Sequence, residues 1–131
     1  METRNVNRMI QSVRDLIVYK AAFDAAMEIF NITKSFPREE KYSLTDQIRR
    51  SSRSVCSNLS ESWRKRKYIA VFKNKLSDCA SEAAETQTWL QFARQCQYIA
   101  DDSFSRLDNR YEQIFAMLTS MEHKADKFCK Q

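Results

Sequence analysis

The fold of this chain is decided by residues 104–128, which read FSRLDNRYEQIFAMLTSMEHKADKF. Apolar side chains recur there at steps that alternate between three and four residues, at Phe104, Leu107, Tyr111, Ile114, Leu118, Met121, Ala125 and Phe128. This spacing places side chains on one face of an α-helix, and its regular alternation is a heptad pattern. Such a face is stable where it packs against other helices. The stretch therefore predicts one member of a helix bundle, over about residues 103–128.

Three further segments have apolar positions at helical spacing, at about residues 14–35, 43–63 and 68–98. The expected inward positions of the first are Leu16, Tyr19, Phe23, Ala26, Phe30 and Thr33. Those of the second are Leu44, Ile48, Ser52, Val55, Leu59 and Trp63. Those of the third are Ile69, Phe72, Leu76, Cys79, Ala83, Leu90 and Ala93. Phe36-Pro37 ends the first helix, because the residue before a proline avoids the α region.

Long helices joined by short polar connections lie antiparallel, side by side. We therefore expect an all-α, antiparallel, up-and-down four-helix bundle that forms a single domain over residues 14–131, after a flexible leader at 1–13. The composition agrees, since the 131 residues include no glycine and one proline, Pro37. β-Hairpins and phosphate-binding loops depend on glycine for positive φ angles and for close backbone approach. A β-rich fold would thus be very unusual, and a glycine-rich nucleotide-binding loop is excluded.

The sequence gives little support for a metal, a cofactor or a catalytic site. The four cysteines, Cys56, Cys79, Cys96 and Cys129, form no C-x-x-C pair, and His123 is the one histidine. We interpret the cysteines as reduced and mostly buried thiols. No apolar run approaches the 18 or so residues of a membrane span, and the polar start does not resemble a signal peptide. We expect a cytoplasmic protein that binds no metal, no cofactor and no membrane, and that is not an enzyme.

Charge is distributed unevenly along the chain, although the net charge is only +5. Nine basic residues and one acid, Glu61, lie between positions 49 and 75; the basic ones are Arg49, Arg50, Arg53, Arg64, Lys65, Arg66, Lys67, Lys73 and Lys75. Arg49, Arg53 and Arg64 share one stripe of the second predicted helix. A polyanion such as RNA would neutralise many of these charges at once, and arginine binds phosphate bidentately. The alternative is an ordinary solvated face, although such faces usually mix signs.

Several other polar and aromatic residues have two possible interpretations each, one functional and one structural. Tyr42, Tyr68 and Tyr98 at predicted helix ends either stack on unpaired bases or pack locally with a hydrated hydroxyl. Asn58 and Glu61 lie one helical turn apart on the second helix. They are either buried polar contacts between helices or subunits, or surface residues.

Residues 36–61 read FPREEKYSLTDQIRRSSRSVCSNLSE. This stretch joins a turn, a helix cap, a basic pair and a polar pair at fixed spacing. It resembles the four-helix bundle family whose members are encoded in intervening sequences of bacterial 23S rRNA genes, a family that includes accessory variability proteins of diversity-generating retroelements. Asp15–Ala21 and Leu76–Glu82 resemble the family as well, and the similarity covers about residues 15–120. Ser60-Glu61-Ser62 stands where the family commonly has Ala-Glu-Gly, so we expect the helix to continue into Trp63.

The resemblance implies a bundle that assembles into a ring-like homopentamer. The accessory members imply binding to a reverse transcriptase and to template RNA through a positive surface. The match falls on Gln47, Arg49, Arg50, Asn58 and Glu61. We therefore expect a nucleic-acid-binding accessory protein, with Gln47, Asn58 and Glu61 in oligomer or interhelix contacts. The alternatives are an oligomeric scaffold that binds only proteins and, least supported, a nuclease or metal oxidase.

Overall fold

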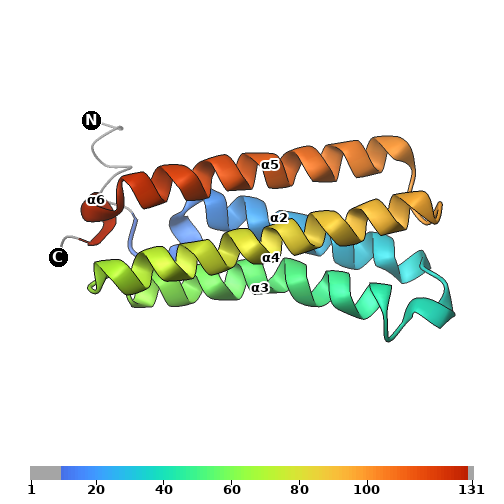
Figure 1. The fold of residues 1–131 in the computed structure, drawn as a ribbon, viewed down its shortest axis with the longest axis horizontal. Helices are drawn as coiled ribbons and strands as arrows, with labels where there is room; N and C mark the ends of the chain where they lie inside the picture. The colour runs from blue at the N-terminus through green and yellow to red at the C-terminus, as the bar shows by residue number, and fades with distance from the viewer. Residues whose placement is uncertain (1–9, 130–131) are drawn as a thin grey trace.

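The computed structural model describes residues 10–129, which fold into four long antiparallel helices (Figure 1). They are α2 (Ile17–Ile32), α3 (Leu44–Arg64), α4 (Ile69–Gln95) and α5 (Asp101–His123). Short elements complete the chain: the 3-10 turns η1 (Val13–Asp15), η2 (Thr33–Ser35) and η3 (Arg38–Glu40), and the short helix α6 (Ala125–Cys129). The predicted all-α fold with four long helices in one domain is confirmed. Residues 1–9, which hold most of the predicted leader, lie outside the described residues.

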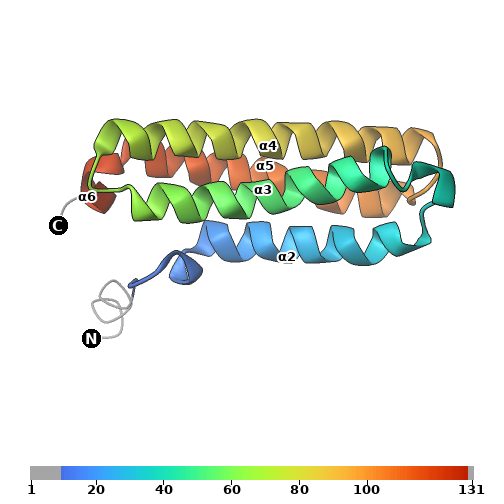
Figure 2. The same ribbon diagram turned by 90° about the horizontal axis from the view of Figure 1, so that it is seen from below.

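The helices run up and down in chain order, so that each packs beside its neighbour in sequence and α5 returns to α2 (Figures 1 and 2). The most extensive contact joins α3 and α4. Small side chains allow it, because Ser51, Ser52 and Ser62 of α3 are buried. Ser51 and Thr86 of α4 share a buried hydrogen bond of 2.8 Å between their hydroxyl oxygens. Within residues 10–129, no helix is both long enough and apolar enough to span a membrane.

The heptad face of residues 104–128 is buried as predicted from Phe104 to Met121, but the helix is not continuous. It begins at Asp101, two residues earlier than expected, and ends at His123, where Lys124 adopts φ −104° and ψ 25°. The chain then forms α6, which packs against α4. The break lets Phe128 reach across the end of the bundle, with its ring centroid 6.2 Å from those of both Trp63 and Phe72.

The inward face of α2 differs from the prediction. The side chains that are buried there are mainly small, namely Val18, Ala22, Ala25, Ala26 and Ile29. Phe23 and Met27, by contrast, are 48% and 45% exposed. Three of the six predicted positions are buried, namely Leu16, Ala26 and Thr33, so the predicted face was correct in part. It was wrong at Phe23, because α2 is apolar on two sides and close packing favours the side with the smaller residues.

The helix ends explain the remaining differences from the predicted ranges. The range 14–35 is divided into η1, α2 and η2, because Ser12 and Asp15 form a capping box that closes a separate 3-10 turn before α2. The predicted 43–63 and the observed α3 differ by one residue at each end. Ile69, which was expected to point inward, is 45% exposed at the first position of α4.

At its other end α4 stops at Gln95, three residues before the predicted 98. The backbone N–H of Tyr98 donates to the carbonyl of Ala93 over 2.8 Å, and that of Gln97 donates to Arg94 over 2.9 Å. These two bonds form a Schellman motif, which requires a left-handed residue after the helix. Gln97 fills this position with φ 64°.

Candidate nucleic-acid interface

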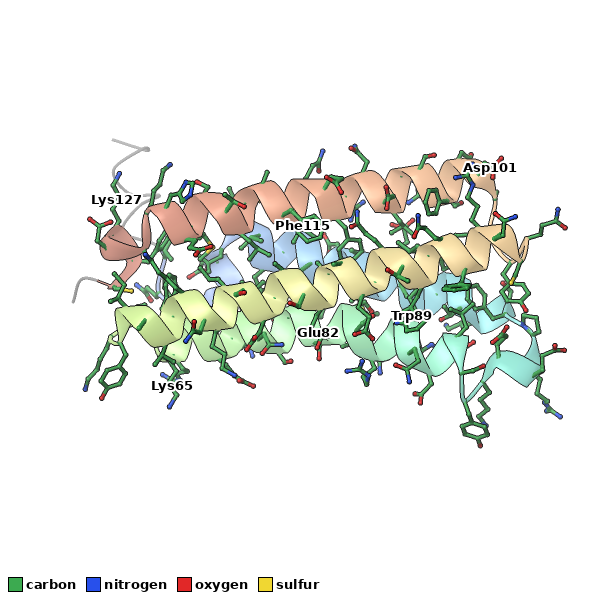
Figure 3. All side chains as sticks on the ribbon, viewed as in Figure 1. Lys65, Glu82, Trp89, Asp101, Phe115 and Lys127 are labelled. Atoms are coloured by element: carbon green, nitrogen blue, oxygen red, sulfur yellow. The ribbon has the colours of Figure 1, made fainter. Side chains whose placement is uncertain are left out.

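One end of the bundle gathers four segments from three separate parts of the sequence. These are η1, the end of α3, the start of α4, and α6 (Figure 1). Lys65 and Lys127 both lie at this end in Figure 3, whereas Asp101 lies at the opposite end. Arg14 and Arg64 line the same surface hollow. We use the name basic end for six residues of this region: Arg14, Arg64, Lys65, Arg66, Lys67 and Lys73.

Five of these six cations face solvent without an acidic partner. Arg14, Arg64, Lys65, Lys67 and Lys73 are exposed, and none of them forms an ion pair within residues 10–129. Acids of the same segments are Asp15, Glu61 and Asp126, and Glu61 is paired with Lys75. Asp15 is occupied locally, because its carboxylate accepts hydrogen bonds from the backbone N–H groups of Gln11 and Ser12 at 2.9 and 3.2 Å. These bonds lower the pKa of Asp15.

Arg66 differs from the other five because it holds the α3–α4 connection in place. Its guanidinium donates to the carbonyl oxygen of Trp63 over 2.8 Å and lies 4.2 Å from the centroid of the Trp63 ring. Trp63 itself is 8% exposed. The backbone N–H of Tyr68 donates to the carbonyl of Lys65 over 2.9 Å, which closes the turn. The exposed cations beside Arg66 therefore lie on a connection whose backbone is held in one conformation.

The predicted stripe along the second helix does not form one free basic surface. Arg49 is half-buried, and its Nε donates to Thr33 Oγ1 over 2.8 Å. Its guanidinium also lies 4.8 Å from the ring centroid of Phe30 and reaches the Phe30 carbonyl at 3.5 Å. A cation there complements the negative C-terminal end of α2. Arg53 lies 5.5 Å from the same ring and borders the groove between α2 and α3.

Two other cations of the predicted set are neutralised on the side of α3 that meets α4. Arg50 is 2.7 Å from the carboxylate of Glu85 and 4.0 Å from that of Glu82. Lys75 is 2.8 Å from Glu61, and this hydrogen bond raises the pKa of Lys75. The nine basic residues of positions 49–75 are therefore separated into structural, paired and solvent-facing groups.

The polar residues that were expected in oligomer or interhelix contacts are placed differently from one another. Glu61 reaches α4 through Lys75. Asn58 donates from Nδ2 to the carbonyl of Ser54, 3.0 Å away within its own helix. Gln47 is half-buried near the start of α3.

The cysteines do not come together as a metal site. Among residues 10–129, no group of three or more His, Cys, Asp and Glu side chains is arranged to hold a metal ion. Cys56 and Cys79 are buried thiols, and burial raises their pKa values to about 11 and about 12. Cys96 is exposed just past the end of α4, and Cys129 is half-buried beside Arg66 and Lys73.

The 23S rRNA-intervening sequence protein model matches residues 14–120, which is most of the chain. The chain belongs to the 23S rRNA-intervening sequence protein family. A crystal structure of a protein of unknown function from the S23 ribosomal protein family of Bacteroides thetaiotaomicron is similar to it, with a TM-score of 0.73 and 29% identity. The match covers 81% of this chain and 98% of that one. No curated protein matches.

The basic end of this family member includes one residue that the charge pattern alone did not indicate. Arg14 is fifty positions before Arg64, yet the two line the same hollow. The predicted up-and-down order contained the necessary signal. In such a bundle the start of the first helix meets the end of the second and the start of the third.

Proposed function

We propose that this chain is a non-enzymatic, cytoplasmic accessory protein that binds structured RNA through its basic end. The observation that supports the proposal is the group of five exposed cations, Arg14, Arg64, Lys65, Lys67 and Lys73, without ion-pair partners among the described residues. Three of the residues that were first assigned to nucleic acid, Arg49, Arg50 and Arg53, instead have the contacts described above. In this proposal their contribution to RNA binding is minor.

A dense group of unpaired cations suits a phosphate backbone for two physical reasons. Each contact releases condensed counterions from the nucleic acid, so that several together give a salt-dependent affinity. The arginines add bidentate hydrogen bonds to phosphate oxygens. Side chains on one fixed turn also lose less entropy on binding than side chains on a flexible loop.

Self-association is the second part of the proposal. The resemblance to the family implies a homopentamer, and α2 offers an apolar surface on which a second copy would pack. Phe23 and Met27 are 48% and 45% exposed on this helix and line one groove between α2 and α3. A ring would repeat the basic end in each subunit and increase the affinity for a long RNA through avidity. A reverse transcriptase is the protein partner that the accessory members of the family suggest.

The decisive experiment measures binding of a structured RNA to the full chain across a salt series. The test variant is Arg64→Gln/Lys65→Gln/Lys67→Gln, and the matched control, Lys34→Gln/Arg38→Gln/Lys41→Gln, removes the same charge at the opposite end. The test variant is expected to bind on the order of tenfold more weakly or worse at low salt. Its slope of log affinity against log salt should fall by about 0.7 for each lost contact to single-stranded RNA.

The control variant separates a local surface from a general effect of charge. Equal weakening in both variants would mean that net charge alone attracts RNA, and would overturn the assignment to the basic end. Unchanged binding in the test variant, with its fold verified by urea unfolding, would do the same. Absence of binding by the wild-type protein at low salt would leave the protein-only scaffold as the function.

A further inference from the structure

The three tyrosines near helix ends are in different environments, and the difference bears on which RNA is bound. Tyr98 is engaged, because its hydroxyl donates to a carboxylate oxygen of Glu40 over 2.9 Å and its ring lies 5.3 Å from that of Phe36. Tyr42 and Tyr68 are 82% and 55% exposed. Two aromatic faces are therefore accessible to a flat ligand.

Tyr68 directly follows the cations of the α3–α4 connection. It is the residue before the first turn of α4, and its side chain makes no capping hydrogen bond there. Lys67 Nζ lies 5.5 Å from the centroid of the ring. The next exposed apolar residues, Ile69 and Val71, are 45% and 38% exposed. An aromatic ring, an apolar margin and a group of cations thus occur within a few residues.

The chain contains a natural counterpart to this arrangement. Lys41 and Tyr42 form the same dipeptide at the opposite end, with Lys41 Nζ 5.3 Å from the ring centroid. There the neighbouring residues in sequence include the acids Glu39, Glu40 and Asp46. Carboxylates repel a phosphate backbone, so these acids oppose the attraction of Lys41 for RNA, whereas the cations before Tyr68 have no acid among them in sequence.

We propose that Tyr68 is a stacking platform for an unpaired nucleobase, which makes loops or single strands of RNA, and not continuous duplex, the preferred ligand. This inference rests on the proposed RNA binding at the basic end and names its ligand class. Stacking needs a base whose face is accessible, and bases inside a duplex are already stacked. The cations hold the flanking phosphates while the ring contacts the base.

The test compares two RNA probes of equal length, a hairpin with a long unpaired loop and a fully paired duplex. The variants are Tyr68→Ala, Tyr68→Phe and the control Tyr42→Ala. Tyr68→Ala is expected to lose about tenfold in affinity for the hairpin, in the range found when a stacking aromatic is removed. Tyr68→Phe should retain the wild-type affinity because it keeps the ring, and Tyr42→Ala should change nothing.

A second measurement reports stacking of the base directly, at protein concentrations that saturate the RNA. A fluorescent base analogue in the loop is quenched when it stacks, so wild-type protein and Tyr68→Phe should quench it and Tyr68→Ala should not. Equal affinity of the wild-type protein for both probes, or unchanged hairpin binding by Tyr68→Ala, would overturn the stacking platform while leaving RNA binding intact. Absence of binding to both probes would overturn the two proposals together.

Discussion

The two ends of the bundle differ in how far their charged residues are partnered by acids. At the end where α2 meets α3 and α4 meets α5, Glu40 accepts hydrogen bonds from the hydroxyls of Ser43 and Tyr98 at 2.7 and 2.9 Å. Arg94 there is 3.0 Å from Asp101. At the basic end, five cations point into solvent without such partners in the described part of the chain.

The difference separates charges that hold a fold together from charges that are available to a ligand. Both kinds come from the same residue types, so composition does not distinguish them. At the first end, charged groups fix the connections between helices. At the basic end this task is performed mainly by packing, since Phe128 and Arg66 cover Trp63. The surface cations are therefore not needed for stability, and three experiments follow from this contrast.

The largest expected effect comes from removing a buried ring at the first end. Phe36 is 8% exposed and packs with Leu44 and Ala93. Phe36→Ala should lower the free energy of unfolding by about 3 kcal/mol, as is typical for removal of a buried aromatic. Ile69→Ala, at a half-exposed position near the basic end, should cost less than about 1 kcal/mol. Urea unfolding measures both, and equal losses would mean that burial of Phe36 does not stabilise the first end.

An intermediate effect is expected within the basic end itself. Arg66→Ala removes the hydrogen bond to the Trp63 carbonyl and the contact with its ring, and should destabilise the protein by about 1 kcal/mol. Lys65→Ala, the neighbouring exposed cation, should change the stability by less than about 0.5 kcal/mol. If thermal unfolding showed that Lys65→Ala lowers the stability more than Arg66→Ala does, the division between structural and solvent-facing cations would be wrong.

The smallest expected effect is a change in the pKa of Tyr98. The hydrogen bond to Glu40 raises the pKa of Tyr98 from an ordinary 10.0 to about 12. A raised pKa in the folded state means that the stabilisation is complete below pH 10 and is lost as the pH rises towards 12. Glu40→Gln should bring the Tyr98 transition back towards 10. Ultraviolet absorbance of the phenolate measures this, with Tyr98→Phe to assign the transition; an unmoved midpoint would exclude the hydrogen bond as its cause.

The buried face could be predicted from the sequence for α5 but only in part for α2, because the two helices differ in how their apolar residues are distributed. Residues 104–113 carry apolar side chains only at Phe104, Leu107 and Tyr111, so only one face of that part of α5 can be buried. α2 carries apolar side chains on two sides, and spacing alone favoured the larger Tyr19 and Phe23. The choice of Val18, Ala22 and Ala25 depends on how closely the neighbouring helices approach, which is a property of three helices together.

The candidate site was predictable in its position along the chain but not in its composition. A run of cations with one acid indicated residues 49–75. The acids that neutralise Arg50, namely Glu82 and Glu85, come from the next helix and are absent from that window. Arg49 likewise contacts a neighbouring element that lies outside the window, because its Nε donates to Thr33 just after α2. Lys65 and Lys67 remain because they lie on the connection between α3 and α4, and Arg64 remains because it is the last residue of α3.

The left-handed turn at Gln97 has a consequence for the composition of the protein as a whole. The chain contains no glycine, yet Gln97 adopts a φ angle that glycine accommodates without steric cost. A residue with a Cβ atom is strained there by roughly 1 kcal/mol. The lack of glycine is thus a property of this particular sequence, and the four-helix fold does not require it. Residue 97 is the position at which a substitution to glycine would relieve strain and stabilise the bundle.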